Sequence, residues 1–114
     1  MYRPILSLSL LLLPCLLSAQ ASSGTQLDAL LKKAEESLEK GIAFYQTLAI
    51  EGGYVYHYTL DGEERWGEGK TDARTIEVQP PGTPAVGMSF LRAYRATGNP
   101  DFLKAAEAAG FALI

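Results

Sequence analysis

The segment at residues 79–84, Gln-Pro-Pro-Gly-Thr-Pro, constrains the fold of this chain more than any other stretch. Proline fixes the backbone angle φ and has no amide proton to donate, so this segment does not suit the interior of a helix. The residue before each proline is pushed towards extended geometry, which stiffens the segment further. We expect a rigid, shaped loop that serves either as a connector or as a wall of a substrate site.

A helix is predicted to begin at the end of this loop. Thr83 suits the N-cap position and Pro84 the first helical residue. The first turn would then leave free backbone N–H groups directed towards the loop. Val86, Phe90 and Tyr94 follow at helical spacing and mark the buried side of this helix.

A second helix is predicted after a very short turn, which makes an antiparallel helical hairpin. Gly98 lies where a helix C-terminus favours glycine, and Asn99 and Pro100 suit the N-cap and first turn of the next helix. Gly110 would allow the two helices to approach closely. The expected apolar stripe of the second helix consists of Phe102, Ala106, Ala109 and Leu113.

A long amphipathic helix is predicted before the loop, starting at Thr25. Thr25 and Asp28 have the spacing of a capping pair, and the charged residues at positions 32–40 would form the solvated face. The sequence Glu51-Gly52-Gly53 is expected to end this helix. Its buried face is predicted to carry Leu27, Leu31, Ala34, Leu38, Ile42 and Tyr45.

Between these helices the sequence predicts a small β-hairpin. Residues 54–59 alternate so that three tyrosines fall on one face of a strand, and Asp61 and Gly62 are a turn signal that leads back through residues 63–66. Residues 75–79 make a further extended piece. The only histidine, His57, has no cysteine or second histidine nearby, so a packed or half-exposed strand position is favoured over a metal ligand.

These patterns predict a mainly α fold of helical hairpins, with a small β-hairpin and a Pro-rich loop as insertions. One long helix followed by a helical hairpin fits the start of a helical array.

Residues 1–21 have the pattern of a secretory signal peptide. Arg3 supplies the positive charge, residues 5–17 the apolar stretch, and residues 19–21 an Ala-Gln-Ala cleavage site. The apolar stretch is shorter than the roughly 20 residues that cross a bilayer, so we expect no stable membrane anchor. A lipid anchor on Cys15 is the alternative, although Pro14 fits poorly before it. The sequence predicts a secreted or periplasmic protein whose mature chain starts at Ser22.

Removal of this segment changes the charge and the cysteine content of the chain. The full sequence carries a net charge of −3, and loss of Arg3 makes it −4, which argues against a nucleic-acid binder. The mature chain has no cysteine and therefore no disulfide. Because residues 111–114 stop within a helical pattern, we expect either that this chain is the opening part of a larger enzyme or that a partner buries its apolar end.

Four stretches carry a likeness to a known family: Gly52-Gly53-Tyr54, Arg65-Trp66-Gly67-Glu68-Gly69, residues 79–87 and residues 90–98. Together they resemble the N-terminal part of the secreted pectate lyases, the pectic acid lyase family with an α/α-toroid catalytic domain. The resemblance covers roughly half of the chain, and the Gln-Pro-Pro-Gly-Thr-Pro segment is its most specific part.

The resemblance implies that residues 22–114 are the N-terminal portion of an α/α toroid in an enzyme that cleaves pectate (polygalacturonate) by β-elimination. It also implies a calcium cofactor and an arginine base. The catalytic residues of that family lie in later helices and loops, so we assign no catalytic residue here and expect this chain alone to be inactive. A glycoside hydrolase or sugar epimerase on the same toroid, and a non-catalytic helical-repeat binding protein, are the alternatives.

Four residues are candidates for contact with an anionic polysaccharide such as pectate. Arg65, Lys70 and Arg74 could pair with uronate carboxylates, and Trp66 could stack on a sugar ring. Surface charge and a core tryptophan are the plain alternatives. Glu68 and Asp72 are candidate calcium ligands, but two carboxylates without a dense pattern of oxygen ligands do not define a metal site. The net negative charge of the mature chain also opposes a polyanionic substrate.

Overall fold

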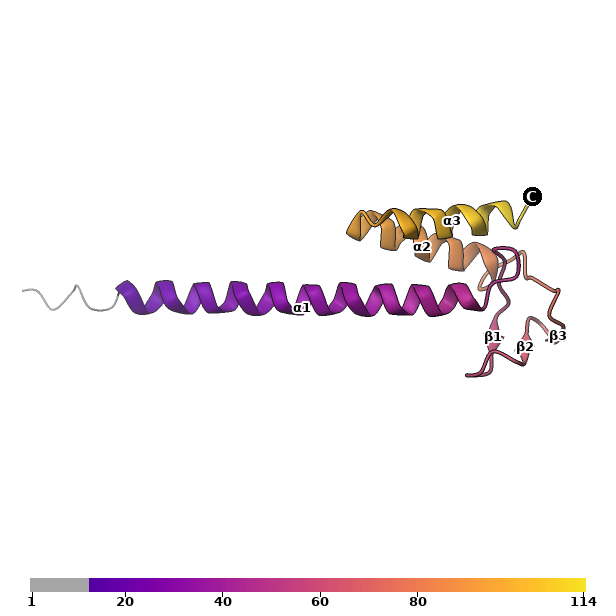
Figure 1. The fold of residues 1–114 in the computed structure, drawn as a ribbon, viewed down its shortest axis with the longest axis horizontal. Helices are drawn as coiled ribbons and strands as arrows, with labels where there is room; N and C mark the ends of the chain where they lie inside the picture. The colour runs from indigo at the N-terminus through magenta and orange to yellow at the C-terminus, as the bar shows by residue number, and fades with distance from the viewer. Residues whose placement is uncertain (1–12) are drawn as a thin grey trace, which may run out of the picture. The chain divides into compact units, whose positions relative to one another are not determined.

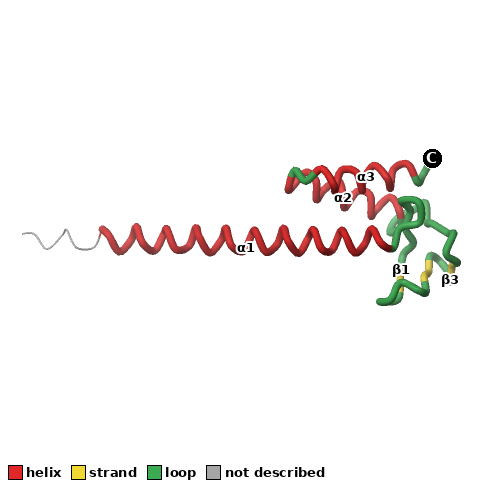
Figure 2. The backbone as a smooth tube through the Cα atoms, viewed as in Figure 1, coloured by secondary structure: helices red, strands yellow, loops and turns green. Residues whose placement is uncertain are grey.

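The computed structural model describes the backbone of residues 13–114 and the side chains of residues 23–114. This part of the chain is mainly helical and carries a small antiparallel sheet (Figures 1 and 2), which confirms the predicted fold class at this level. The chain divides into two units, Met1–Glu36 and Ser37–Ile114, which are described separately. The predicted signal peptide lies outside the described residues, except for a helical backbone from Leu13 onward, and stays a prediction.

Helix α1 runs from Leu13 to Thr47 and begins well before the predicted start. Thr25 lies inside this helix, so the predicted N-cap at Thr25 is wrong. The physical reason is that nothing near Thr25 interrupts the helix. Pro14 lies in the first helical turn, where a proline is tolerated, and no proline follows before Thr47.

In the unit Met1–Glu36, the apolar residues of α1 whose side chains are described are open to solvent. Leu27, Leu30 and Leu31 are 56%, 64% and 54% exposed, and Ala34 is exposed as well. The predicted burial of Leu27, Leu31 and Ala34 is therefore wrong. Helical spacing identifies an apolar face but not its partner, and the described part of this unit contains no second element that could cover the face.

In the unit Ser37–Ile114, the last turns of α1 enter the core through Ile42, which is 7% exposed, while Tyr45 is partly buried and Leu38 remains exposed. The helix ends at Thr47, a few residues before the predicted stop. Ile50 and Gly53 then exchange two backbone hydrogen bonds of 2.9 and 2.8 Å. The turn between them needs positive φ at Glu51 (49°) and at Gly52 (86°), which glycine adopts without strain.

Three short strands form an antiparallel sheet in the order β1-β2-β3: β1 His57–Tyr58, β2 Arg65–Trp66 and β3 Lys70–Thr71 (Figure 1). The predicted hairpin around Asp61 and Gly62 is confirmed, although its strands are shorter than expected. Strand β3 was not predicted. Residues 75–79 form no strand, but Glu77 N–H donates to the carbonyl of Tyr54 at 2.8 Å.

Helices α2 (Thr83–Thr97) and α3 (Pro100–Phe111) pack side by side as the predicted helical hairpin (Figure 1). Gly98 has a left-handed backbone, with φ of 72°, and its N–H donates to the Tyr94 carbonyl at 2.7 Å. Asn99 Oδ1 accepts from the Asp101 N–H at 3.0 Å and caps α3. Both caps are confirmed.

The close approach of α2 and α3 occurs at Gly87, not at the predicted Gly110. A β-carbon on Gly87 would lie 3.0 Å from Ala109 Cβ, whereas one on Gly110 would have no neighbour within 4 Å. Gly110 lies on an exposed side of α3, so its small size has no packing role among the described residues.

The core of this unit joins the end of α1, the segment before β1 and the hairpin α2–α3. Tyr54 is its central aromatic residue: its ring stacks on Tyr45 at 5.5 Å between centroids and meets the edge of Phe90 at 5.9 Å. The buried members are Ile42, Tyr54, Val86, Phe90, Ala93, Phe102, Ala105 and Ala109. Within the described residues, no helix has the length and apolar character that a membrane span requires.

Candidate functional site

The Pro-rich loop is tied to the segment before β1 by the side chain of Thr83. Its hydroxyl accepts from the Tyr54 N–H at 3.0 Å and donates to the Tyr54 carbonyl at 3.1 Å, and the residue is fully buried. The prediction that Thr83 is the N-cap of α2 is therefore wrong. Gly82 takes that position without a side-chain cap, because the hydroxyl is already used by both backbone groups of Tyr54.

Glu77 packs against glycines from two other segments. Gly67 lies directly against the Glu77 carboxyl group, and a β-carbon on Gly82 would be 2.5 Å from Glu77 Cβ. The carbonyl of Glu77 also accepts from the Thr83 N–H at 3.0 Å. Gly67 and Gly82, from two of the stretches compared with the pectate lyases, thus meet at Glu77 as closely packed structural positions rather than as reactive groups.

The strand register divides the candidate residues between the two faces of the sheet. Trp66 is paired with His57 on one side and with Lys70 on the other, so these three residues share one face, here called the Trp66 face. Arg65 is paired with Tyr58 and Thr71, which form the opposite face, here called the Arg65 face. Arg65 and Trp66, predicted as joint contacts, therefore point in opposite directions.

Arg65 is partly buried, and its side chain packs against the protein. Its guanidinium carbon lies 5.6 Å from the centroid of the Tyr58 ring, and its Nη1 is buried without a hydrogen-bond partner. Thr71 Oγ1 donates to the Arg65 carbonyl at 3.2 Å. Burial raises the pKa of the Tyr58 hydroxyl, which also accepts from the Val55 N–H at 2.8 Å.

The Trp66 face is more open. His57 and Lys70 are exposed, and Trp66 is partly buried between them. Lys70 Nζ forms an ion pair with Glu64 at 2.7 Å, and both side chains are at least half exposed. His57 was not predicted as a sugar contact. The missed signal was the turn itself, because a hairpin centred on Asp61 and Gly62 pairs position 57 with position 66.

Arg74 lies apart from the sheet, in the loop after β3, and is exposed. The Asp72 carboxylate organises this loop, accepting from the Arg74 N–H at 2.8 Å and from Thr75 Oγ1 at 2.9 Å. These hydrogen bonds, that of the Arg74 backbone first, lower the pKa of Asp72. The structure thus brings Trp66 and Lys70 together and leaves Arg65 and Arg74 elsewhere.

The carboxylates near the sheet do not fit a calcium site. Glu68 Oε1 accepts from Gln79 Nε2 at 3.0 Å, and Asp72 is used by its own loop. Asp61 accepts from the Thr59 hydroxyl and from the Glu63 N–H, and these bonds lower its pKa. In the part of the chain whose side chains are described, no group of three or more histidine, cysteine or acidic residues could hold a metal ion.

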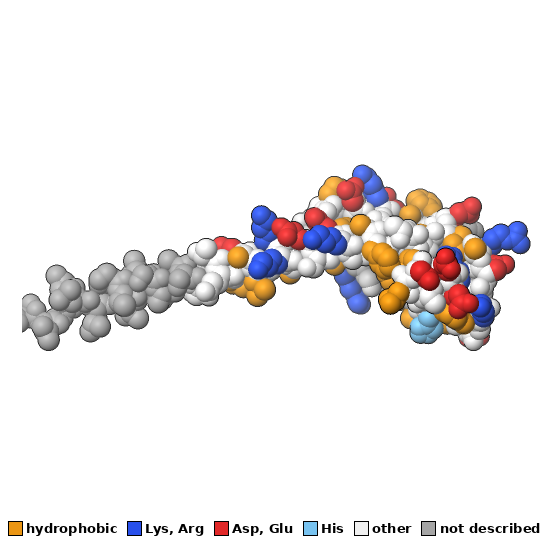
Figure 3. Space-filling view, turned by 60° about the horizontal axis from the view of Figure 1, so that its bottom comes forward, with side chains coloured by type: hydrophobic (Ala, Val, Ile, Leu, Met, Phe, Trp, Pro, Cys, Tyr) orange, Lys and Arg blue, Asp and Glu red, His pale blue; other side chains and the backbone are white. Residues whose placement is uncertain are grey.

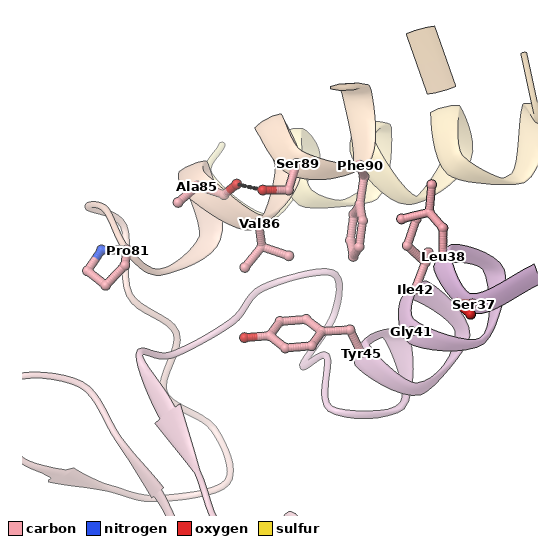
Figure 4. A pocket seen from close by; sticks show the side chains of 10 residues that line it. All are labelled: Ser37, Leu38, Gly41, Ile42, Tyr45, Pro81, Ala85, Val86, Ser89 and Phe90. Carbon is pink, nitrogen blue, oxygen red and sulfur yellow. Dashed lines mark hydrogen bonds between the residues drawn. The ribbon is translucent and has the colours of Figure 1, made fainter. Parts of the chain in front are cut away.

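An apolar groove of about 460 Å³ lies between the end of α1 and the start of α2 (Figure 4). Tyr45 and Phe90 project into it from the two helices. Ser89 lies on its wall, but its hydroxyl already donates to the Ala85 carbonyl at 2.9 Å. The groove therefore offers apolar contact and little chemistry. Its lining residues are Ser37, Leu38, Gly41, Ile42, Tyr45, Pro81, Ala85, Val86, Ser89 and Phe90.

Acidic and basic side chains are interspersed on the surface shown in Figure 3. Residues 57–79 contain six acidic residues against Arg65, Lys70 and Arg74, so the surroundings of the sheet are negative overall. A scan against protein-family models, a search of characterised proteins and a search of solved structures each found no match to this chain.

Proposed function

We propose that this chain forms the N-terminal portion of the α/α-toroid catalytic domain of a secreted polysaccharide lyase that cleaves pectate by β-elimination. The observation that carries the proposal is the position of the residues that resemble the pectate lyases. Gly67, Tyr54 and the adjacent pair Gly82–Thr83 come from three separate stretches. Gly67 and Gly82 both lie against Glu77, and Thr83 bonds to Tyr54. If this chain and the pectate lyases share a fold, residues that pack against one another would be expected to occur together in both sequences.

The role proposed for this chain is to bind the polymer, not to perform the chemical step. Breaking the sugar chain by elimination requires removal of a proton next to a uronate carboxylate, which needs a positioned base and neutralisation of the developing charge. The candidate side chains here do not supply that set: Arg65 is partly buried against Tyr58, and Lys70 is paired with Glu64. The carboxylates near the sheet do not fit a calcium ion either, so we assign no step to calcium on this chain.

The test is an assay of the protein from the complete reading frame on polygalacturonate, with calcium added and with a chelator. The lyase proposal expects an unsaturated product that absorbs ultraviolet light, formed only when calcium is present. The 114-residue chain alone is expected to give no product and serves as the control. Appearance of new reducing ends without unsaturation would replace the proposal with a glycoside hydrolase, and sugar isomerisation without chain cleavage would indicate an epimerase.

A further inference from the structure

We propose that the Trp66 face of the sheet is a stacking platform for one hexuronate ring of an anionic polysaccharide. Glu64 competes with the carboxylate of that ring for the ammonium group of Lys70. This inference rests on the proposed function for its ligand class. Its geometry comes from the register, which places His57, Trp66 and Lys70 side by side on three adjacent strands. Cross-strand neighbours of this kind lie about 5 Å apart at Cβ, which is close enough for one sugar ring to touch all three.

The three side chains have the chemistry that such a ring requires. The Trp66 indole offers a flat apolar surface with a polar N–H at its edge. Lys70, the neighbour of Trp66 on β3, carries an ammonium group that can pair with the ring's carboxylate, and His57 adds a hydrogen-bonding group from β1. The face is accessible, because His57 and Lys70 are exposed and Trp66 is only partly buried.

The opposite face holds the platform in place. Arg65 packs over the Tyr58 ring, and Thr71 Oγ1 donates to the Arg65 carbonyl at 3.2 Å, so all three strands are connected behind Trp66. These residues are partly buried and act as positioning residues. Arg65, predicted as a binding residue, is in this way reassigned to support of the platform.

The ion pair between Lys70 and Glu64 sets the affinity of the platform. Its two side chains are 63% and 50% exposed, so the pair contributes little stability and can be exchanged for a ligand carboxylate. Glu64 repels that carboxylate and occupies the ammonium group. Removing the charge of Glu64 is therefore expected to strengthen binding, whereas removing the charge of Lys70 weakens it.

The experiment uses the fluorescence of Trp66, which is the only tryptophan in the 114-residue chain and so reports this face directly. The chain is titrated with trigalacturonate and, separately, with the neutral galactose trisaccharide of the same linkage. Saturable change with trigalacturonate is expected. Lys70→Gln should lower its affinity roughly fivefold, which corresponds to about 1 kcal/mol, without changing the response to the neutral sugar.

Arg74→Gln is the matched control, because it removes the same charge from an exposed side chain outside the platform. It should change the affinity less than twofold, while Glu64→Gln should raise it. Equal losses of affinity in Lys70→Gln and Arg74→Gln would overturn the proposal in favour of unspecific charge attraction. An absence of any fluorescence change in the wild-type chain would also overturn it, because no ligand would then contact Trp66. Binding is measured without cleavage, so a negative lyase assay would remove the proposed function and leave this result standing.

Discussion

Tyr54 brings packing, hydrogen bonding and ionisation together in one residue. It is 2% exposed, its ring lies against Tyr45 and Phe90, and both of its backbone groups bond to Thr83. Burial, followed by the nearby Tyr58 and Tyr45 hydroxyls, raises the pKa of the Tyr54 hydroxyl from 10.0 to about 12. The neutral phenol is therefore part of the folded core.

This shift predicts a loss of stability at alkaline pH. Below pH 10 the phenol is protonated in both states, and between pH 10 and about 12 only the unfolded chain releases its proton. The free energy of unfolding should fall by about 2.7 kcal/mol over that range, which is the equivalent of two pKa units. Urea unfolding followed by far-ultraviolet circular dichroism at the two ends of the range measures the change.

Tyr54→Phe is the control, because it keeps the ring and removes the titrating group. The variant should lose most of the dependence on pH, and Tyr58, whose pKa is also raised by burial, should account for a remainder. An undiminished alkaline loss in Tyr54→Phe would show that another group controls it.

Single residues also show where sequence patterns mislead. A threonine before a proline at a helix start is typical of an N-cap, yet the hydroxyl of Thr83 bonds to a backbone that lies 29 residues away. The local sequence around Thr83 does not show that the Tyr54 backbone will be the partner of this hydroxyl. In the same way, both Gly87 and Gly110 offer the hairpin a small residue, and only the relative rotation of the helices decides that Gly87 makes the contact.

Among the elements, the helical hairpin was the most predictable. Gly98, Asn99 and Pro100 specify the end of one helix and the start of the next through local backbone geometry, and all three have the expected roles. The register of the β-hairpin could also be predicted from the sequence, because the turn at Asp61 and Gly62 fixes it. Strand β3 could not be predicted, because its two residues form a strand only through their pairing with β2.

The loop between the sheet and α2 yields a prediction about packing. Gly82→Ala should destabilise the protein by about 1 to 3 kcal/mol, because its new β-carbon would lie 2.5 Å from Glu77 Cβ and 2.9 Å from the Glu77 carbonyl oxygen. Alanine is also a poorer N-cap residue than glycine. Thermal or urea unfolding of the purified variant measures the loss.

Gly69→Ala is the comparison variant, because a β-carbon there has no neighbour within 4 Å. It should change stability by less than about 0.5 kcal/mol. Equal stability of the Gly82→Ala variant and wild type would contradict the tight packing of the loop against Glu77.

At the scale of the whole molecule, the burial of α1 could not be predicted from its sequence. The same apolar spacing extends from Leu27 to Tyr45, but Ile42 reaches a packed core and Leu27 does not. Periodicity reports which side of a helix is apolar, and burial depends on what packs against it. The same limit applies to the proposed toroid, whose closure would depend on contacts that a helical pattern does not encode.

Export is a further prediction for the whole chain. If residues 1–21 are a signal peptide, the secreted protein should begin at Ser22 and carry no lipid, because Cys15 is removed with the leader. Mass spectrometry of the protein recovered from the medium or periplasm measures both properties. A mass that includes Met1, or one increased by acyl groups, would contradict this prediction.

The bonds between Thr83 and Tyr54 also have a consequence for cooperativity. They close a loop that contains all three strands, and strands of two residues are too short to persist by themselves. The sheet and the first turn of α2 should therefore open as one cooperative unit. The backbone amides of Tyr54 and Glu77 should then exchange with deuterium together. A saccharide held on the Trp66 face would slow that exchange and stabilise the helical hairpin through linkage, without touching either helix.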